Sequence, residues 1–87
     1  RIDGLRVERQ VPVPVEYRGR RVECGYRIDM LVEKSVVVEL KVVNAFHKVH
    51  VSQVLTYLRL AELRVGLLFN FNVDTLAAGG IKRVLRG

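Results

Sequence analysis

The stretch YRIDMLVEKSVVVELKVV, residues 26–43, decides the fold. Two apolar runs rich in β-branched residues flank a polar segment at 33–35, a pattern typical of a β-hairpin. Three ionisable residues, Asp29, Glu39 and Lys41, interrupt these runs. Strand interiors disfavour Asp, Glu and Lys, and an unpaired buried charge is costly. The hairpin therefore carries charges that call for a physical reason.

The length of the connecting loop decides whether the two carboxylates meet. With a three-residue loop at 33–35, counting along the strands places Asp29 directly opposite Glu39. With a two-residue loop, Asp29 would lie opposite Val38 and on the other face of the hairpin from Glu39, because a slip of one residue reverses the face of every side chain. The sequence leaves both loops open.

If Asp29 and Glu39 meet, their repulsion must be offset. Two carboxylates about 5 Å apart repel by about 3 kcal/mol at an effective dielectric of about 20. Lys41 shares the face of Glu39 and offers partial compensation. A divalent cation would offset more, because oxygen ligands on adjacent strands suit Mg²⁺. A water held by such an ion can attack a phosphodiester, with Lys41 stabilising the charge that develops.

These residues therefore favour metal-dependent phosphodiester hydrolysis. The alternative is a structural one, in which Glu39 and Lys41 form an ion pair on a solvated face. That alternative predicts no metal binding and little change when Glu39 is replaced by Gln. The continuous apolar runs on both sides of the charged residues favour the hydrolytic interpretation.

Two predicted strands of a meander surround the turn at Gly19. Val residues alternate over 11–15, and Pro12 and Pro14 exclude a helix interior and suit an edge strand. A second strand is expected at 22–32. The hairpin of residues 26–43 then supplies the third strand, so consecutive strands pair antiparallel.

The pattern changes after the third strand, which is expected to cover 36–43. Apolar residues then recur at helical spacing over about 47–64. The run at 65–71, VGLLFNF, reads as a buried strand that returns parallel to the third strand. The rest of the chain is expected to hold a short turn or helix and a last strand at 81–85. The predicted fold class is thus α/β, with a three-stranded antiparallel meander, a helix and a parallel strand in one mixed sheet.

The predicted helix carries its own polar group. His50, Gln53 and Tyr57 share one face because their spacings are three and seven. This face is expected at the carboxyl end of the sheet near Lys41, where Gln53 orients a water or contacts a phosphate and Tyr57 hydrogen-bonds a substrate or site residue. The alternative is a solvated Gln53 and a core Tyr57 with an exposed hydroxyl.

The other candidate metal ligands and the composition exclude further classes of site and protein. His47 and His50 lack a zinc spacing and Cys24 is remote, so no zinc site is expected. The single cysteine fits a reducing compartment, which predicts a cytoplasmic protein. The 87 residues fit one small domain, and they include no apolar run of the roughly 20 residues that span a membrane.

A net charge of +6 points to a polyanionic partner, with nucleic acid as the first choice. Arg18, Arg20 and Arg21 surround the turn at Gly19 and are candidates for contact with the phosphate backbone. The alternatives are a basic surface without a partner and a solvated hairpin tip.

Three motifs resemble a known family. GYRIDMLV at 25–32 followed by VVVELKVV at 36–43 resembles the Asp…Glu-x-Lys signature of the PD-(D/E)XK nuclease superfamily. QVLTY at 53–57 is similar to the Q-x-x-x-Y helix motif of its RecB-like members. Together with GLLFNFN at 66–72, these motifs make nearly the whole chain similar to the small GxxExxY proteins.

The resemblance implies a restriction-endonuclease-like core and cleavage of DNA, with RNA as the alternative. It implies that Asp29 and Glu39 bind Mg²⁺ or Mn²⁺, that Lys41 is catalytic, and that Gln53 and Tyr57 border the site. The competing interpretation is a catalytically inactive domain that binds nucleic acid or a protein.

One motif of the GxxExxY proteins does not occur in this chain. The glycine–glutamate–tyrosine motif of their amino-terminal helix is absent from the sequence, which begins at Arg1. The expectation is therefore a single domain over 1–87 that lacks this helix. Surface left exposed by its absence leads us to expect a homo-oligomer.

Overall fold

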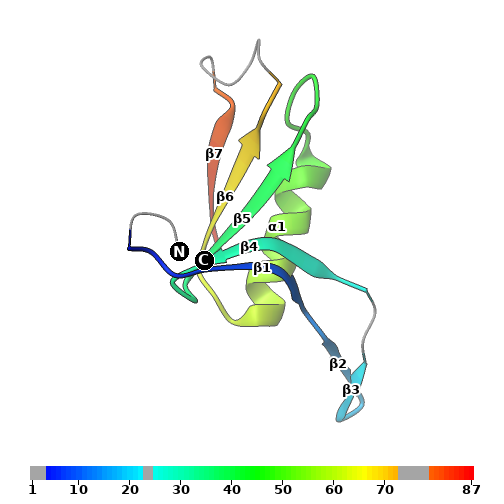
Figure 1. The fold of residues 1–87 in the computed structure, drawn as a ribbon. Helices are drawn as coiled ribbons and strands as arrows, with labels where there is room; N and C mark the ends of the chain where they lie inside the picture. The colour runs from blue at the N-terminus through cyan, green and yellow to red at the C-terminus, as the bar shows by residue number, and fades with distance from the viewer. Residues whose placement is uncertain (1–3, 23–24, 73–78) are drawn as a thin grey trace.

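The computed structural model describes residues 4–22, 25–72 and 79–87. A five-stranded mixed sheet in the order β1-β4-β5-β6-β7 packs one face against helix α1, and a second sheet pairs β2 with β3 (Figure 1). The elements are β1 (Val7–Pro12), β2 (Val15–Tyr17), β3 (Arg20–Val22), β4 (Arg27–Val32), β5 (Val36–Lys41), α1 (Lys48–Ala61), β6 (Val65–Asn70) and β7 (Ile81–Leu85).

The pairing confirms the predicted fold class. Strands β1, β4 and β5 form an antiparallel meander, and β6 lies parallel to β5 after the crossover through α1. The expected last strand is β7, which pairs antiparallel with β6. The turn or helix expected before it falls largely on residues 73–78, and Cys24 is also outside the described residues.

The prediction of one strand over 11–15 was wrong. Residues 7–12 form β1, which pairs with β4, whereas β2 and β3 form a separate hairpin that projects from the sheet (Figure 1). Pro12 and Pro14 have no N–H group to continue a ladder, which accounts for the break between β1 and β2. Between them, the Val13 N–H donates to the Tyr26 carbonyl at 2.9 Å, and the Val13 side chain enters the core.

Other expected boundaries shift as well. The second strand is divided into β3 and β4, and the third strand ends at Lys41 rather than at residue 43. The helix ends at Ala61, three residues before the predicted end, because Glu62 adopts a left-handed conformation with φ of 57°. In that conformation, the Glu62 N–H turns back to the Arg59 carbonyl and closes the helix.

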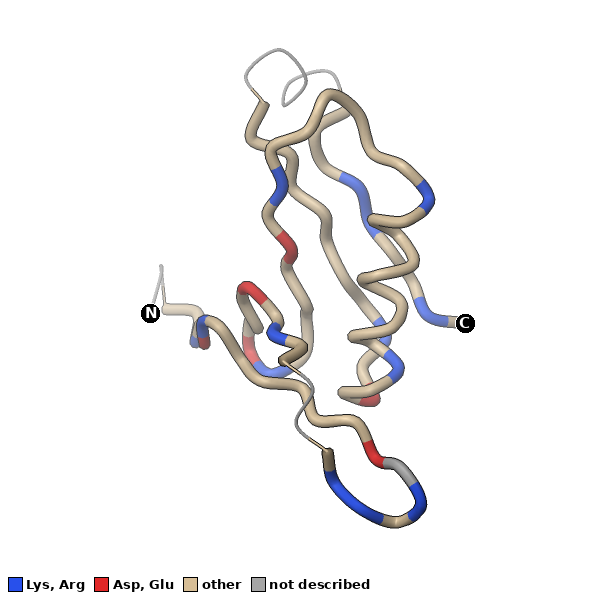
Figure 2. The backbone as a smooth tube through the Cα atoms, turned by 90° about the vertical axis from the view of Figure 1, so that its right-hand side faces the viewer, with Lys and Arg blue, Asp and Glu red and all other residues tan. Residues whose placement is uncertain are grey.

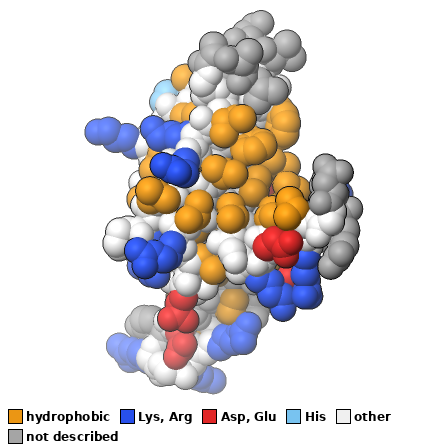
Figure 3. Space-filling model, turned by 90° about the vertical axis from the view of Figure 1, so that its left-hand side faces the viewer, with side chains coloured by type: hydrophobic (Ala, Val, Ile, Leu, Met, Phe, Trp, Pro, Cys, Tyr) orange, Lys and Arg blue, Asp and Glu red, His pale blue; other side chains and the backbone are white. Residues whose placement is uncertain are grey.

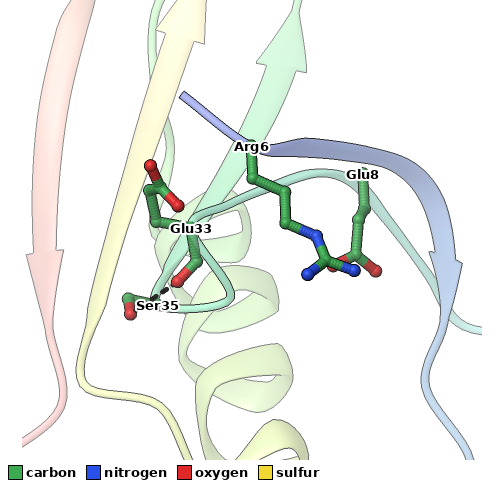
Figure 4. Close-up of polar contacts among 4 residues, drawn as sticks. All are labelled: Arg6, Glu8, Glu33 and Ser35. Atoms are coloured by element: carbon green, nitrogen blue, oxygen red, sulfur yellow. Dashed lines mark hydrogen bonds and ion pairs between the residues drawn. The ribbon is translucent and has the colours of Figure 1, made fainter. Parts of the chain in front are cut away.

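The β4–β5 turn settles the loop length. Val32 pairs with Val36, so the loop has three residues. The Ser35 N–H donates to the Val32 carbonyl at 3.0 Å, and the Ser35 hydroxyl donates to the Glu33 carbonyl at 2.9 Å (Figure 4). Glu33 and Lys34 both have positive φ, near 52°, which is uncommon for residues with a Cβ. This register is the one that brings Asp29 and Glu39 to facing positions.

The core lies between the sheet and α1. Ile28, Val37 and Leu68 from the sheet meet Val54 and Leu58 from the helix, and each is almost fully buried. Burial of this apolar surface is the main stabilising contribution to the fold.

The opposite face of the sheet is more open. Leu40, Ile81 and Leu85 expose between about a third and just over half of their surface there. Figure 3, which views the molecule from the side of β7, shows hydrophobic side chains gathered into a group with Lys and Arg at its margin. The homo-oligomer expected from the sequence stays a prediction.

Gly66 allows α1 to approach the sheet closely. A Cβ built at this position would lie 2.5 Å from Val54 Cγ1. We therefore expect Gly66→Ala to destabilise the protein by about 1–3 kcal/mol, the usual cost of overpacking. Urea denaturation of the single variants and of Gly66→Ala/Val54→Ala measures the effect. Val54→Ala removes the methyl that the new Cβ would meet. The double variant should therefore lose less free energy of unfolding than the two single variants lose in sum. Strict additivity would contradict the close contact.

Candidate metal and nucleic-acid site

The two carboxylates of the hairpin meet where the β4–β5 ladder ends. Regular pairing runs from Val32–Val36 as far as Met30–Val38. At the next position, two backbone N–H groups donate to carboxylate oxygens on the partner strand instead of to its carbonyls. The Asp29 N–H donates to Glu39 Oε1 at 3.1 Å, and the Leu40 N–H donates to Asp29 Oδ2 at 2.9 Å.

This exchange has two consequences. It opens the strands at the point where the carboxylates lie, and it fixes one oxygen of each carboxylate through a backbone N–H.

Glu39 is the more buried of the two, with 3% of its surface exposed. Burial, reinforced by the negative charge of Asp29, raises the pKa of the Glu39 carboxyl to about 7, although the Asp29 N–H and the charge of Lys41 act in the opposite direction. A carboxyl with this pKa is only partly ionised at neutral pH. A positive ion beside it would favour the ionised form.

Lys41 begins a chain of hydrogen bonds that links the sheet to the helix. Lys41 Nζ donates to Gln53 Oε1 at 2.7 Å, and Gln53 Nε2 donates to Tyr57 Oη at 3.1 Å. Burial raises the pKa of the Tyr57 hydroxyl above its ordinary value of 10.0, with smaller contributions from the charges of Glu39 and Asp29. Tyr57 therefore keeps its proton at neutral pH and remains a hydrogen-bond donor.

The structure decides between the alternatives that the sequence left for these residues. An ion pair between Glu39 and Lys41 on a solvated face is wrong, because Glu39 is buried and, within the described residues, the two form no ion pair. Gln53 is half-buried and bonded at both ends, so it is not simply solvated. The Tyr57 ring lies in the core, and its hydroxyl accepts from Gln53, a predicted site residue; its contact with a substrate stays a prediction.

A pocket of about 480 Å³ opens beside Lys41. Lys41, Gln53 and Tyr57 line it together with His50 and Tyr26. His50 Nδ1 also accepts from the His47 N–H at 2.9 Å, a bond that holds the start of α1. The helical polar group predicted from the sequence therefore lies at one pocket.

Asp29 lies in a different pocket from Lys41. It lines a pocket of about 560 Å³ with Arg9 and Leu40. Glu39 interacts with both sides, through its hydrogen bond with Asp29 and its attraction to Lys41. The five predicted residues thus form two bonded groups, Asp29 with Glu39 and Lys41 with Gln53 and Tyr57, and the charge of Lys41 acts on Glu39.

Sequence reasoning missed Asn70. Asn70 is 1% exposed, and its side-chain amide forms hydrogen bonds with the backbone. Its Nδ2 donates to the Val43 carbonyl at 2.7 Å. Its Oδ1 accepts from the Val43 and Asn72 N–H groups at 3.1 Å each. Asn70 pairs with Lys41 in the parallel ladder, and the Phe71 N–H donates to the Lys41 carbonyl at 2.8 Å. The end of β6 therefore fixes the chain on both sides of Lys41.

Tyr26 was also missed. Its ring meets that of Tyr57 edge to face, with centroids 6.0 Å apart and planes at 68°. Both missed residues gave weak signals, an Asn in an apolar run and a Tyr at the start of a strand. Their partners lie 27 and 31 positions away, at Val43 and Tyr57, so only the folded chain shows them.

Arg18, Arg20 and Arg21 lie at the β2–β3 hairpin and its turn, and all three are exposed. Figure 2 shows Lys and Arg positions concentrated at the end of this hairpin. The predicted basic tip is thus present at a projecting part of the molecule. Its contact with nucleic acid stays a prediction.

The donor set at Asp29 and Glu39 fits Mg²⁺. Within the described residues, no group of three His, Cys, Asp or Glu side chains gathers around a point. Mg²⁺ is commonly held by one or two carboxylates while it keeps several waters, so a pair suffices. The buried Glu39, with its raised pKa, adds a reason for a cation at this position.

Comparison with known proteins identifies one matching family. A family model described as the PD-(D/E)XK nuclease superfamily matches residues 1–84, which include every residue of the site. No curated protein and no solved structure matches the chain. In the part of the chain that the structure describes, no helix is long and apolar enough to cross a membrane.

Proposed function

Because the chain belongs to the PD-(D/E)XK nuclease superfamily, we propose that it is a metal-dependent nuclease that hydrolyses phosphodiester bonds of DNA, with RNA as the alternative. One observation carries the proposal. A buried carboxylate, Glu39, is hydrogen-bonded beside a second carboxylate, and a lysine two residues along the same strand is held by a glutamine.

Asp29 and Glu39 are the residues that would hold Mg²⁺ or Mn²⁺. Members of this superfamily typically depend on a metal ion. When bound, the ion supplies Lewis-acid polarisation of the phosphate and an acidified water. The backbone N–H bonds to Oε1 and Oδ2 orient the two carboxylates in advance, so little side-chain entropy remains to be lost on binding.

Lys41 would stabilise the negative charge that develops on the scissile phosphate or on the attacking water. Its bond to Gln53 holds the ammonium group at the pocket that Lys41 and Gln53 both line. Gln53 is in turn held by the Tyr57 hydroxyl, whose ring is packed in the core. Through Gln53, helix α1 therefore fixes the position of the Lys41 ammonium group, which strand β5 carries.

Within the superfamily, we propose that the chain is related to the GxxExxY proteins. The Gln53 and Tyr57 pair on the helix and the GLLFNFN strand at 66–72 support this placement. Arg18, Arg20 and Arg21 would hold the phosphate backbone outside the site, because such contacts orient a strand without reading its sequence.

A domain that binds nucleic acid without cutting it is the second candidate. The bonding of Lys41 favours it, because within the described residues its ammonium group donates to Gln53 and forms no ion pair with either carboxylate. Turnover distinguishes the two functions, because only the nuclease predicts cleavage that depends on a divalent cation.

The test of the proposed function is cleavage of a 5′-fluorescein oligonucleotide, single-stranded and duplex, in Mn²⁺, in Mg²⁺ and in EDTA. We expect cleavage by the wild type with either ion, none in EDTA, and none by Glu39→Gln. Glu33→Gln is the matched control, because Glu33 is an exposed carboxylate in the β4–β5 turn. Intact substrate in every wild-type reaction would reject turnover, and equal cleavage by Glu39→Gln would reject the site.

A further inference from the structure

Tyr26 gives the Lys41 pocket an aromatic wall that the proposed chemistry does not use. The residue is 42% exposed, although it lines the same pocket as Lys41, Gln53 and Tyr57. Tyr57, by contrast, is 5% exposed and belongs to the core. Tyr26 therefore offers an aromatic surface to solvent directly beside the basic group.

Two contacts fix the position of this ring. The Tyr26 carbonyl accepts from the Val13 N–H at 2.9 Å, which anchors its backbone to the segment between β1 and β2. The ring itself is held edge to face against Tyr57. A ring fixed in this way loses little conformational entropy when a second flat group packs on it.

The pocket is of a size and composition that suits one nucleotide. Its volume of about 480 Å³ lies within the range of about 300–1,000 Å³ that is usual for small-molecule sites. Lys41 supplies positive charge for a phosphate, and the rings of Tyr26 and His50, with the side chain of Val49, supply flat and apolar surface for a base.

We propose that Tyr26 stacks a base of single-stranded nucleic acid next to the phosphate bound at Lys41. The inference rests on the proposed function and names its substrate class. Base stacking on aromatic side chains is a general means of binding single strands, because every base has a π-face. In a duplex, the same base is already stacked between its neighbours and would have to leave the helix to enter the pocket, at a cost of free energy. The site therefore selects single strands, or duplex ends and gaps that are already open.

Binding is measured in EDTA, where no cleavage occurs, with a fluorescein-labelled dT12 and a 12-base-pair duplex. We expect the wild type to bind dT12 more tightly than the duplex. Tyr26→Ala should weaken dT12 binding by about 5- to 150-fold, the effect of losing one stacked base. Tyr26→Phe is the matched control, because it keeps the ring and should bind within about threefold of the wild type.

A second variant reports stacking directly. The chain has no tryptophan, so Tyr26→Trp introduces a single indole at the pocket. We expect dT12 to quench its fluorescence, whereas a polyphosphate of equal charge, which has no bases, should leave it nearly unchanged. Equal quenching by both probes would show that only phosphate binds there and would overturn the inference.

The outcomes separate this inference from the proposed function. Loss of dT12 binding in Tyr26→Ala, without any wild-type cleavage in Mn²⁺, would keep the stacking site and reject the nuclease. Cleavage in Mn²⁺ with equal dT12 affinity for Tyr26→Ala and Tyr26→Phe would support the nuclease and reject the stacking site. A wild type that binds the duplex better than dT12, or binds neither, would also overturn the stacking site.

Discussion

Replacing Glu39 with Gln is expected to make the metal-free protein more stable at pH 8, by about 1–3 kcal/mol. The pKa of Glu39 rises from 4.5 to about 7 on folding, with burial as the largest cause. Ionising a buried carboxyl beside a second carboxylate is unfavourable, and Gln has nearly the same shape without the charge. Gln also keeps an oxygen that can accept from the Asp29 N–H, so the hairpin should retain its geometry.

The sign of the pH dependence follows from the direction of the shift. Because the folded-state pKa lies above the unfolded value, protonated Glu39 stabilises the fold. This contribution is fully present below about pH 4.5 and is lost as the pH rises to about 7. The free energy of unfolding should therefore fall across this window in the wild type and change less in Glu39→Gln.

Urea denaturation in EDTA, at intervals between pH 4 and pH 8, measures the difference between the two proteins. Using the difference removes the contributions of groups that titrate in both. Glu33→Gln should behave as the wild type does, because that carboxylate is exposed. Parallel curves for wild type and Glu39→Gln would contradict a buried, uncompensated carboxyl at this position.

Replacing Lys41 with Met is expected to slow cleavage by about 10²- to 10³-fold, the usual effect of losing one group that stabilises transition-state charge. Met keeps most of the aliphatic stem and removes the ammonium group. The loss should lie in the chemical step, because the charge acts mainly on the phosphate as the transition state forms. Affinity for the uncut strand should change far less than the rate.

Single-turnover cleavage with excess protein separates these effects, because it isolates chemistry from product release. Lys34→Met, in the exposed β4–β5 turn, is the control for the loss of one positive charge. Lys41→Arg should restore only part of the rate, since the guanidinium has a different shape and fork geometry. A Lys41→Met rate within a few fold of the wild type would show that Lys41 has no catalytic role.

The sequence was sufficient where its patterns are local. The order of strands, the helix and the parallel return followed from periodicity and from the handedness of crossovers, and the structure has this arrangement. The meeting of Lys41 with Gln53 followed from the faces of a strand and a helix that are consecutive in the chain.

The sequence was insufficient where distant contacts decide. The loop length stayed open because Glu33, Lys34 and Ser35 carry no Gly or Asn signal for a particular turn, and hydrogen bonds of Ser35 settle it. The first strand was misplaced because valines alternate across both prolines, whereas the pairing of β1 with β4 ends at Pro12. Asn70 escaped notice because its role depends on a backbone segment that approaches only after β5 and β6 pair.

The central claim is that Asp29 and Glu39 form a metal site, and calorimetric titration of Mn²⁺ tests it most directly. The wild type and Asp29→Asn/Glu39→Gln are titrated at pH 6.5 in two buffers of different ionisation enthalpy. The account predicts binding by the wild type with release of a fraction of a proton, because Glu39 must ionise to bind the ion, and no binding by the double variant. Folded wild-type protein that does not bind Mn²⁺, or a double variant that binds it equally well, would contradict the account.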